Sequence, residues 1–75
     1  MAPLPVVTPR QLIHALERAG FFIHHVRGSH HFLKHPNDPA RRTTIAYHTK
    51  PLKRGTLRAI LKQANVTVEE LTELL

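Results

Sequence analysis

The sequence predicts an α+β sandwich in the order α-β-β-β-α, with a three-stranded antiparallel sheet, helices on one face of it and a short C-terminal helix. Residues 8–20 and 55–65 repeat apolar side chains at three- and four-residue spacing, which is typical of amphipathic helices. Between them lie three short segments rich in β-branched and aromatic residues and bounded by turn formers, as in a meander of strands. A chain of 75 residues suits one domain, so we expect residues 1–75 to form a single unit.

The first helix carries its own start and stop signals. Residues 1–7 include two prolines and are expected to form an extended lead-in. Thr8 suits the N-cap, Pro9 the first helical position, and Gln11 the reciprocal position of a capping box. Gly20 is expected to end the helix. The apolar face between these signals consists of Leu12, Ile13, Leu16 and Ala19.

Three strands are expected over residues 21–27, 29–35 and roughly 42–47. Successive side chains of a strand point to opposite faces of the sheet. His24 and His25 are therefore expected on different faces, where they cannot both line one site.

The middle strand has two distinct faces. One is expected to carry His30, Phe32 and Lys34, and the other His31 and Leu33. The size of Phe32 favours a position in the core, whereas on an open face its ring would offer a stacking surface for an unpaired RNA base. A bulge at the glycine before this strand would exchange the two faces.

The C-terminal third of the sequence predicts two more helices. Gly55 and Thr56 open the first of them, and Asn65 is expected to end it because asparagine tolerates the left-handed conformation. Thr67 and Glu70 form a second capping box, which opens the short terminal helix.

The composition restricts the classes of function. Cysteine is absent, which excludes a disulfide framework, thiolate chemistry and a sulfur-ligated zinc. No apolar run approaches the roughly 20 residues of a spanning helix, and the first residues lack the features of a signal peptide, so we expect a cytoplasmic protein without a membrane partner. Over residues 1–68, eleven basic residues oppose only Glu17 and Asp38, a formal charge of +9 that favours a nucleic acid or an acidic protein as partner.

A cluster of proton-carrying side chains follows the turn at Gly28. Ser29, His30 and His31 supply a hydroxyl and two imidazoles, and an imidazole exchanges protons near neutral pH. Such a group can deprotonate a ribose 2′-hydroxyl, so RNA can be cleaved without a metal ion. His31 faces away from His30 and is expected to be packed and hydrogen-bonded. His48, at the end of the third strand, is a candidate second proton carrier or phosphate contact.

An ordered set of motifs runs over nearly the whole chain: Ala19-Gly20-Phe21, Gly28-Ser29-His30-His31, Arg42-Thr43-Thr44-Ile45, His48 and residues 55–64. Through this set the chain resembles, from about Thr8 to Leu75, the HicA-type toxins. These are small mRNA interferases of bacterial type II toxin–antitoxin systems, with a fold like a double-stranded-RNA-binding domain. One departure is local, because the family commonly has a proline shortly before the histidine that ends the third strand, where this chain has Ala46-Tyr47-His48.

The resemblance implies a toxin that cleaves mRNA with His30 as its catalytic acid or base and with no cofactor. It also implies a HicB-type antitoxin that covers the site in a hetero-oligomeric complex. Candidates for a supporting role are Gly28, Ser29 and His48. The basic residues that are candidates to hold RNA or the antitoxin are Arg27, Lys34, Arg42, Lys50, Lys53, Arg54, Arg58 and Lys62.

Other interpretations fit some of the same residues. A non-catalytic RNA- or ribosome-binding module would use the same fold and charges, and an interaction domain would meet only protein with its basic face. Arg54, Arg58 and Lys62, at four-residue spacing, equally suit an ordinary solvated helix face. A metal site of His30, His35 and His48 is the weaker alternative, since their spacing suits no helix and no acidic residue stands near to orient them.

Overall fold

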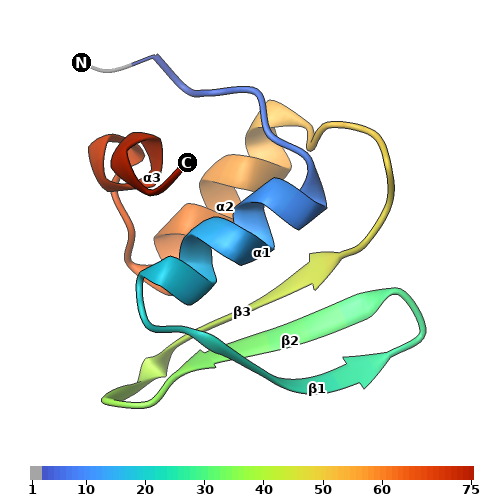
Figure 1. Cartoon of the computed structure of the whole chain (residues 1–75), viewed down its shortest axis with the longest axis vertical. Coiled ribbons are helices and arrows are strands. Elements are labelled where there is room, and N and C mark those ends of the chain that lie inside the picture. The colour runs from blue at the N-terminus through green and yellow to red at the C-terminus, as the bar shows by residue number, and fades with distance from the viewer. Residues whose placement is uncertain (1–2) are drawn as a thin grey trace.

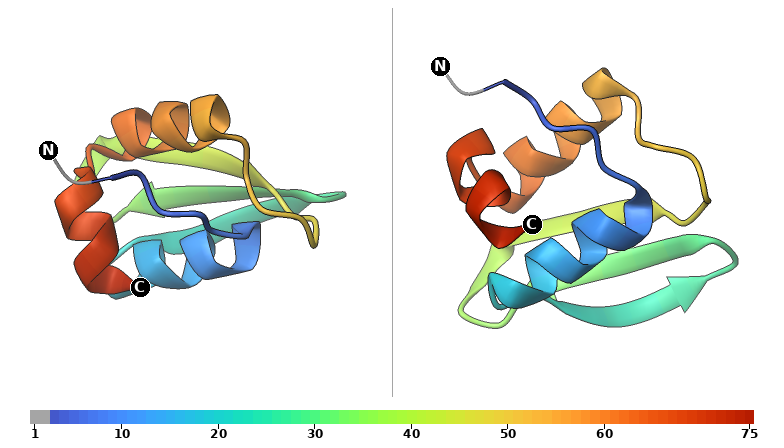
Figure 2. Two further views of the ribbon diagram at one scale, coloured as in Figure 1. Left: turned by 90° about the horizontal axis from the view of Figure 1, so that it is seen from above. Right: turned by 45° about the horizontal axis from the view of Figure 1, so that its top comes forward.

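The computed structural model describes residues 3–75, and its elements follow the predicted order (Figure 1). They are α1 (Pro9–Arg18), β1 (Phe22–Arg27), β2 (His30–His35), β3 (Asp38–Ala46), α2 (Arg54–Ala64) and α3 (Val68–Leu74). The strands form one antiparallel sheet in the order β1-β2-β3, so β2 is central. α1 and α2 lie over one face of this sheet, and within residues 3–75 no helix covers the other (Figure 2). This is the α+β arrangement of a double-stranded-RNA-binding domain, as the sequence predicted.

The local signals for the helices are confirmed. The hydroxyl of Thr8 accepts from the backbone N–H of Gln11 at 3.2 Å, and the Gln11 side chain accepts from the backbone N–H of Thr8 at 2.9 Å. Thr67 and Glu70 make the same reciprocal pair at the start of α3. Asn65 ends α2 in the left-handed conformation with φ 55°. No helix in the described part of the chain is long and apolar enough to span a membrane.

The third strand is longer than the sequence predicted. β3 begins at Asp38 rather than Arg42, so it includes Pro39. A proline is compatible with this position because β3 is an edge strand, where a missing N–H breaks no ladder on the free side. The pairing also shifts between Lys34 and His35, where β3 bulges. The turn formers of this connection therefore lie partly inside a strand.

The core lies between the sheet and the helices. Leu33 of β2 and Ile45 of β3 are fully buried, as are the apolar residues Leu12, Leu16, Leu57 and Leu71 of the helices. The lead-in contributes more than an extended connection. Val7 is buried, and its carbonyl accepts from the backbone N–H of Leu52 at 2.8 Å, which ties the lead-in to the loop before α2.

Burial of Leu33 decides which side chains of β2 face outward. Because faces alternate along a strand, His30, Phe32 and Lys34 share one face, as expected, and this face is the open one. The expectation that Phe32 belongs to the core is wrong. Its ring is half-buried on the open face, outside the core cluster, because Leu33 and not Phe32 meets the helices.

The junction of α1 and β1 depends on a glycine. Gly20 has φ +102°, and a Cβ built on it would lie 3.2 Å from Nε2 of His35. The His35 ring packs edge-on against Phe21 at 5.2 Å between centroids. The guanidinium of Arg41 also lies over the Phe21 ring, 5.2 Å from its centroid. The same guanidinium donates to the carbonyl of Ala64 at 2.9 Å. The contacts join the end of α1 to β2, β3 and α2.

Replacing this glycine should destabilise the fold. Gly20→Ala forces an L-residue into an unfavourable backbone conformation and moves His35, so the free energy of unfolding should fall by about 1–2 kcal/mol. The matched control is Gly55→Ala in the first turn of α2, where a Cβ meets nothing within 4 Å and stability should be unchanged or higher by up to about 1 kcal/mol. Thermal melts of both variants make the comparison. Equal melting temperatures would contradict this account of the junction.

Candidate active site

The hairpin between β1 and β2 places His30 at the first position of its strand. Gly28 and Ser29 form the turn, and Arg27 pairs with His30 across the ladder. Gly28 has φ +59°, with open space around the position of a Cβ, so its backbone conformation and not crowding requires glycine. The turn thus fixes where β2 begins, and the alternation of β2 then directs His30 to the open face.

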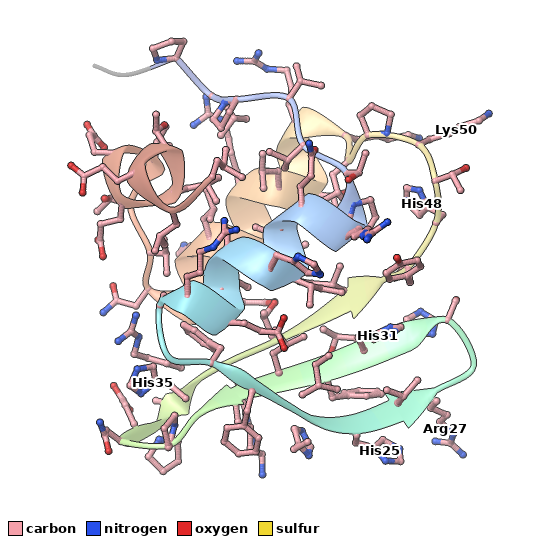
Figure 3. The ribbon with its side chains drawn as sticks, in the orientation of Figure 1. His25, Arg27, His31, His35, His48 and Lys50 are labelled. Atoms are coloured by element: carbon pink, nitrogen blue, oxygen red, sulfur yellow. The ribbon has the colours of Figure 1, made fainter. Side chains whose placement is uncertain are left out.

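His30 lines a hollow of about 760 Å³ at the end of the sheet. His48 lines the same hollow from the loop between β3 and α2, and so do the cations Lys50 and Lys53 of that loop. Figure 3 shows His48 and Lys50 on this loop, beyond the end of β3. Among the described residues around the hollow none is acidic. The complete set is His30, Thr44, Ala46, His48, Thr49, Lys50, Pro51, Leu52, Lys53, Thr56 and Ile60.

The rim of this hollow is formed by the residues that follow β3. β3 ends at Ala46, one residue before the predicted end, so His48 lies in the loop rather than at a strand end. The backbone N–H of Tyr47 still donates to the carbonyl of Ser29 at 2.7 Å. Because proline has no N–H, that bond requires a residue other than proline at position 47. It carries the ladder one step further and leads the chain toward His48.

His31 lies on the opposite side of β2 from His30. Its ring packs on Tyr47 with centroids 5.1 Å apart, and its Nδ1 lies at hydrogen-bond distance, 3.1 Å, from the carbonyl oxygen of Ser29. In Figure 3 it points from β2 toward the helix side of the sheet, away from His25 and Arg27. The two adjacent histidines therefore occupy different environments, one lining the hollow and one packed against an aromatic ring.

The positions of His24 and His25 differ from the prediction made from the sequence. They were expected on opposite faces, but the pairing of β1 with β2 shifts between Ile23 and His25. The extra residue of this bulge brings both imidazoles to Phe32, with ring centroids 6.2 Å away for His24 and 5.3 Å for His25. Regular alternation, on which the prediction depended, fails at this point.

A second hollow, of about 570 Å³, lies beside this group of rings. It is lined by His24, Phe32 and Thr44 and by two cations, Lys34 and Arg42. Lys34 of β2 and Arg42 of β3 lie opposite each other in the sheet register. Loss of hydration lowers the pKa of His24 from 6.5, and the positive charges of Lys34, His25 and Arg42 lower it further. An imidazole with a lowered pKa stays neutral, and therefore uncharged, over more of the neutral pH range.

The remaining candidates lie apart from the two hollows. Arg27 is exposed on β1 beside the hairpin, and its side chain is directed away from the helices in Figure 3. The four-residue row on α2 is exposed and consists of Arg54, Arg58 and Lys62. His35 packs on Phe21, so it does not join the histidines of the first hollow. Within the described residues no three His, Asp or Glu side chains are grouped to hold a metal ion.

The sequence was compared with models of known protein families. A family model described as the HicA toxin of bacterial toxin-antitoxin matches residues 9–66 of the 75-residue chain. The chain belongs to the HicA toxin family. The match spans the elements from α1 to α2, and with them both hollows. As a HicA toxin, the protein is one component of a toxin–antitoxin system. No curated protein matches the chain closely enough to be called a relative.

Substitutions at the two adjacent histidines should differ in their effect on the free energy of unfolding. His31→Ala removes the ring pair with Tyr47 and the contact to Ser29, so the free energy of unfolding should fall by about 1–3 kcal/mol. His30→Ala, at an exposed position, should change it by no more than about 0.5 kcal/mol. His31→Phe keeps the ring pair, so its free energy of unfolding should lie between those of His31→Ala and His30→Ala. Denaturant unfolding measures all three, and a His31→Ala variant as stable as His30→Ala would disprove the packed role.

Proposed function

We propose that this HicA toxin is a single-domain, metal-independent endoribonuclease that cleaves mRNA, with His30 as its proton-transfer residue. One observation carries the proposal: two imidazoles, of His30 and His48, line one hollow together with the cations Lys50 and Lys53. An anionic RNA strand suits such a hollow, and proton transfer at neutral pH suits the imidazoles.

The proposed reaction needs two proton transfers. A base removes the proton of the ribose 2′-hydroxyl, whose oxygen then bonds to the neighbouring phosphorus. The bond from phosphorus to the 5′-oxygen breaks, and an acid gives that oxygen a proton. The products are a 2′,3′-cyclic phosphate and a 5′-hydroxyl, with no change in oxidation state. His30 supplies one of these transfers, and His48, which lines the same hollow, supplies the other.

The cations of the hollow act on the charge that develops during this reaction. The phosphorane carries one more negative charge than the phosphodiester, and a fixed positive group stabilises it most where little water intervenes. Lys50 and Lys53 are the groups available in the hollow itself. Lys34 and Arg42, which line the adjoining hollow, hold the neighbouring phosphates of the strand.

The proposed antitoxin is a protein of the HicB type that neutralises the toxin by covering the hollow in a hetero-oligomeric complex. An acidic surface would meet the loop cations Lys50 and Lys53, which are exposed. The row of Arg54, Arg58 and Lys62 on α2 is open to the same partner or to an RNA backbone. Charge supports both uses equally, because each partner presents negative groups.

Removing the imidazole of His30 tests the proposed function. His30→Ala should lower the single-turnover rate of RNA cleavage by about 10²- to 10⁴-fold, the usual effect of losing a positioned acid or base. RNA affinity should change far less, because phosphate contacts are shared among several cations. His14→Ala, which removes an exposed histidine from α1, is the matched control and should cleave normally. Cleavage at the wild-type rate by folded His30→Ala would disprove the role given to this residue.

The chemistry also predicts the products and the response to a chelator. Cleavage by imidazoles and cationic side chains should continue in EDTA, and mass spectrometry of the products should find 2′,3′-cyclic phosphate and 5′-hydroxyl ends. Loss of activity in EDTA with recovery on adding magnesium or zinc would instead indicate metal-assisted cleavage. RNA binding by folded wild-type protein without any cleavage would favour the non-catalytic module.

A further inference from the structure

Three aromatic rings gather on the open face at a place that the proposed proton transfers do not use. The bulge of β1 brings His24 and His25 to Phe32, and the two imidazoles are 6.3 Å apart between centroids. Figure 3 shows His25 directed away from the helix layer. None of the three rings belongs to the core cluster, so the packing of the fold does not account for the group.

The position of this group relative to His30 is fixed by the strand. Phe32 follows His30 by two residues on the same face of β2, a separation of about 7 Å between Cα atoms. The hollow at the rings and the hollow at His30 share a lining residue, Thr44, which pairs with Phe32. The two hollows therefore adjoin, and a chain-like ligand that fills one extends naturally into the other.

The charges beside the rings indicate what kind of ligand fits. Lys34 and Arg42 line the ring hollow, and no acidic side chain is among its described lining residues. Flat rings next to cations form the combination that holds a single-stranded nucleic acid, in which bases stack on aromatic side chains and phosphates meet the cations. In a duplex the bases are already stacked on one another, so a duplex cannot use the rings in this way.

We propose that Phe32, flanked by His24 and His25, is a base-stacking subsite for an unpaired nucleotide next to the one cleaved at His30. The proposal rests on the proposed function for the position of the cleaved bond, and it adds the substrate class: single-stranded rather than duplex RNA. Lys34 and Arg42 bind the phosphate of the stacked nucleotide. Stacking is tolerant of base identity, so the subsite contributes affinity and register more than sequence preference.

The test measures binding in a protein that does not cleave. In the His30→Ala background, fluorescence anisotropy with a short labelled single-stranded RNA compares Phe32 with Phe32→Leu and Phe32→Tyr. Phe32→Leu keeps an apolar side chain but removes the ring, and should weaken binding by about 5- to 140-fold, the loss of one stacked base at about 1–3 kcal/mol. Phe32→Tyr should bind like the parent protein. The slope of log K against log salt should not change for Phe32→Leu, because no phosphate contact is lost, whereas Arg42→Ala should make it shallower by about 0.7.

A second arm changes the RNA and leaves the protein intact. An abasic nucleotide is moved along the strand one position at a time. At one position it should weaken binding to the parent protein by a similar factor and remove the difference between Phe32 and Phe32→Leu. If no position does so, the subsite does not exist, whatever the stability of the variants.

The outcomes separate this inference from the proposed function. Cleavage by the wild-type protein together with equal RNA affinities of Phe32 and Phe32→Leu overturns the subsite alone. Coupling of Phe32 to one base without cleavage supports the subsite and overturns the nuclease. Unchanged RNA binding with a weakened antitoxin complex for Phe32→Leu overturns the subsite and assigns the rings to the protein partner. A preference for duplex over single-stranded RNA also overturns it.

Discussion

Complete burial of Leu33 in the central strand is the constraint on which the rest of this structure depends. Leu33 and Ile45 meet the helices, and the two-residue period of a strand then sends the alternate side chains to the opposite face. A shift of one residue would exchange the faces of β2 and expose the apolar side chain. The placement of His30, Phe32 and Lys34 on the open face is thus a consequence of core packing.

Because of this constraint, most of the side chains that line the two hollows are different from those that stabilise the fold. A domain of this size buries only about 60% of its unfolded surface, so substitutions in the core are costly. The core takes side chains from both layers and also from the lead-in, where Leu4 and Val7 are buried. The two hollows are lined mainly by side chains outside that cluster. Residues on the open face are therefore free to vary with the ligand at little cost in folding free energy.

The sequence predicted those parts of the molecule that local rules determine. The two capping boxes at Thr8 and Thr67 and the left-handed stop at Asn65 depend on short-range hydrogen bonds and backbone preferences, and all three were predicted correctly. Alternation along β2 correctly predicted that His30, Phe32 and Lys34 share one face, but it did not decide which face meets the helices. The hairpin turn at Gly28 was equally readable, because a glycine before a strand indicates a backbone conformation that other residues avoid.

The errors arose where pairing between strands overrides local rules. The bulge at His24 depends on the register of β1 against β2, and no residue type in this segment marks it. Inclusion of Pro39 in β3 depends on that strand lying at the edge, which the order of elements alone does not determine. Phe32 was misplaced because size predicts burial in general but does not tell which of two neighbouring apolar side chains meets the helices. His30 and His48 line one hollow because of the path that the loop after β3 takes, and the sequence does not specify this path.

The same geometry bears on how an antitoxin would act under the proposed function. Both hollows are bounded partly by α2, through Gln63 in one and Thr56 in the other, so both open along the β3 side of the sheet. Thr44 lines both, so the two hollows adjoin. A protein that covers either hollow then weakens binding of the whole strand, because an RNA held at two adjoining places binds less tightly when it is excluded from one of them. Under the proposed function, an antitoxin could therefore reduce cleavage without contacting His30, and an acidic segment lying across this surface would compete with RNA for the same cations.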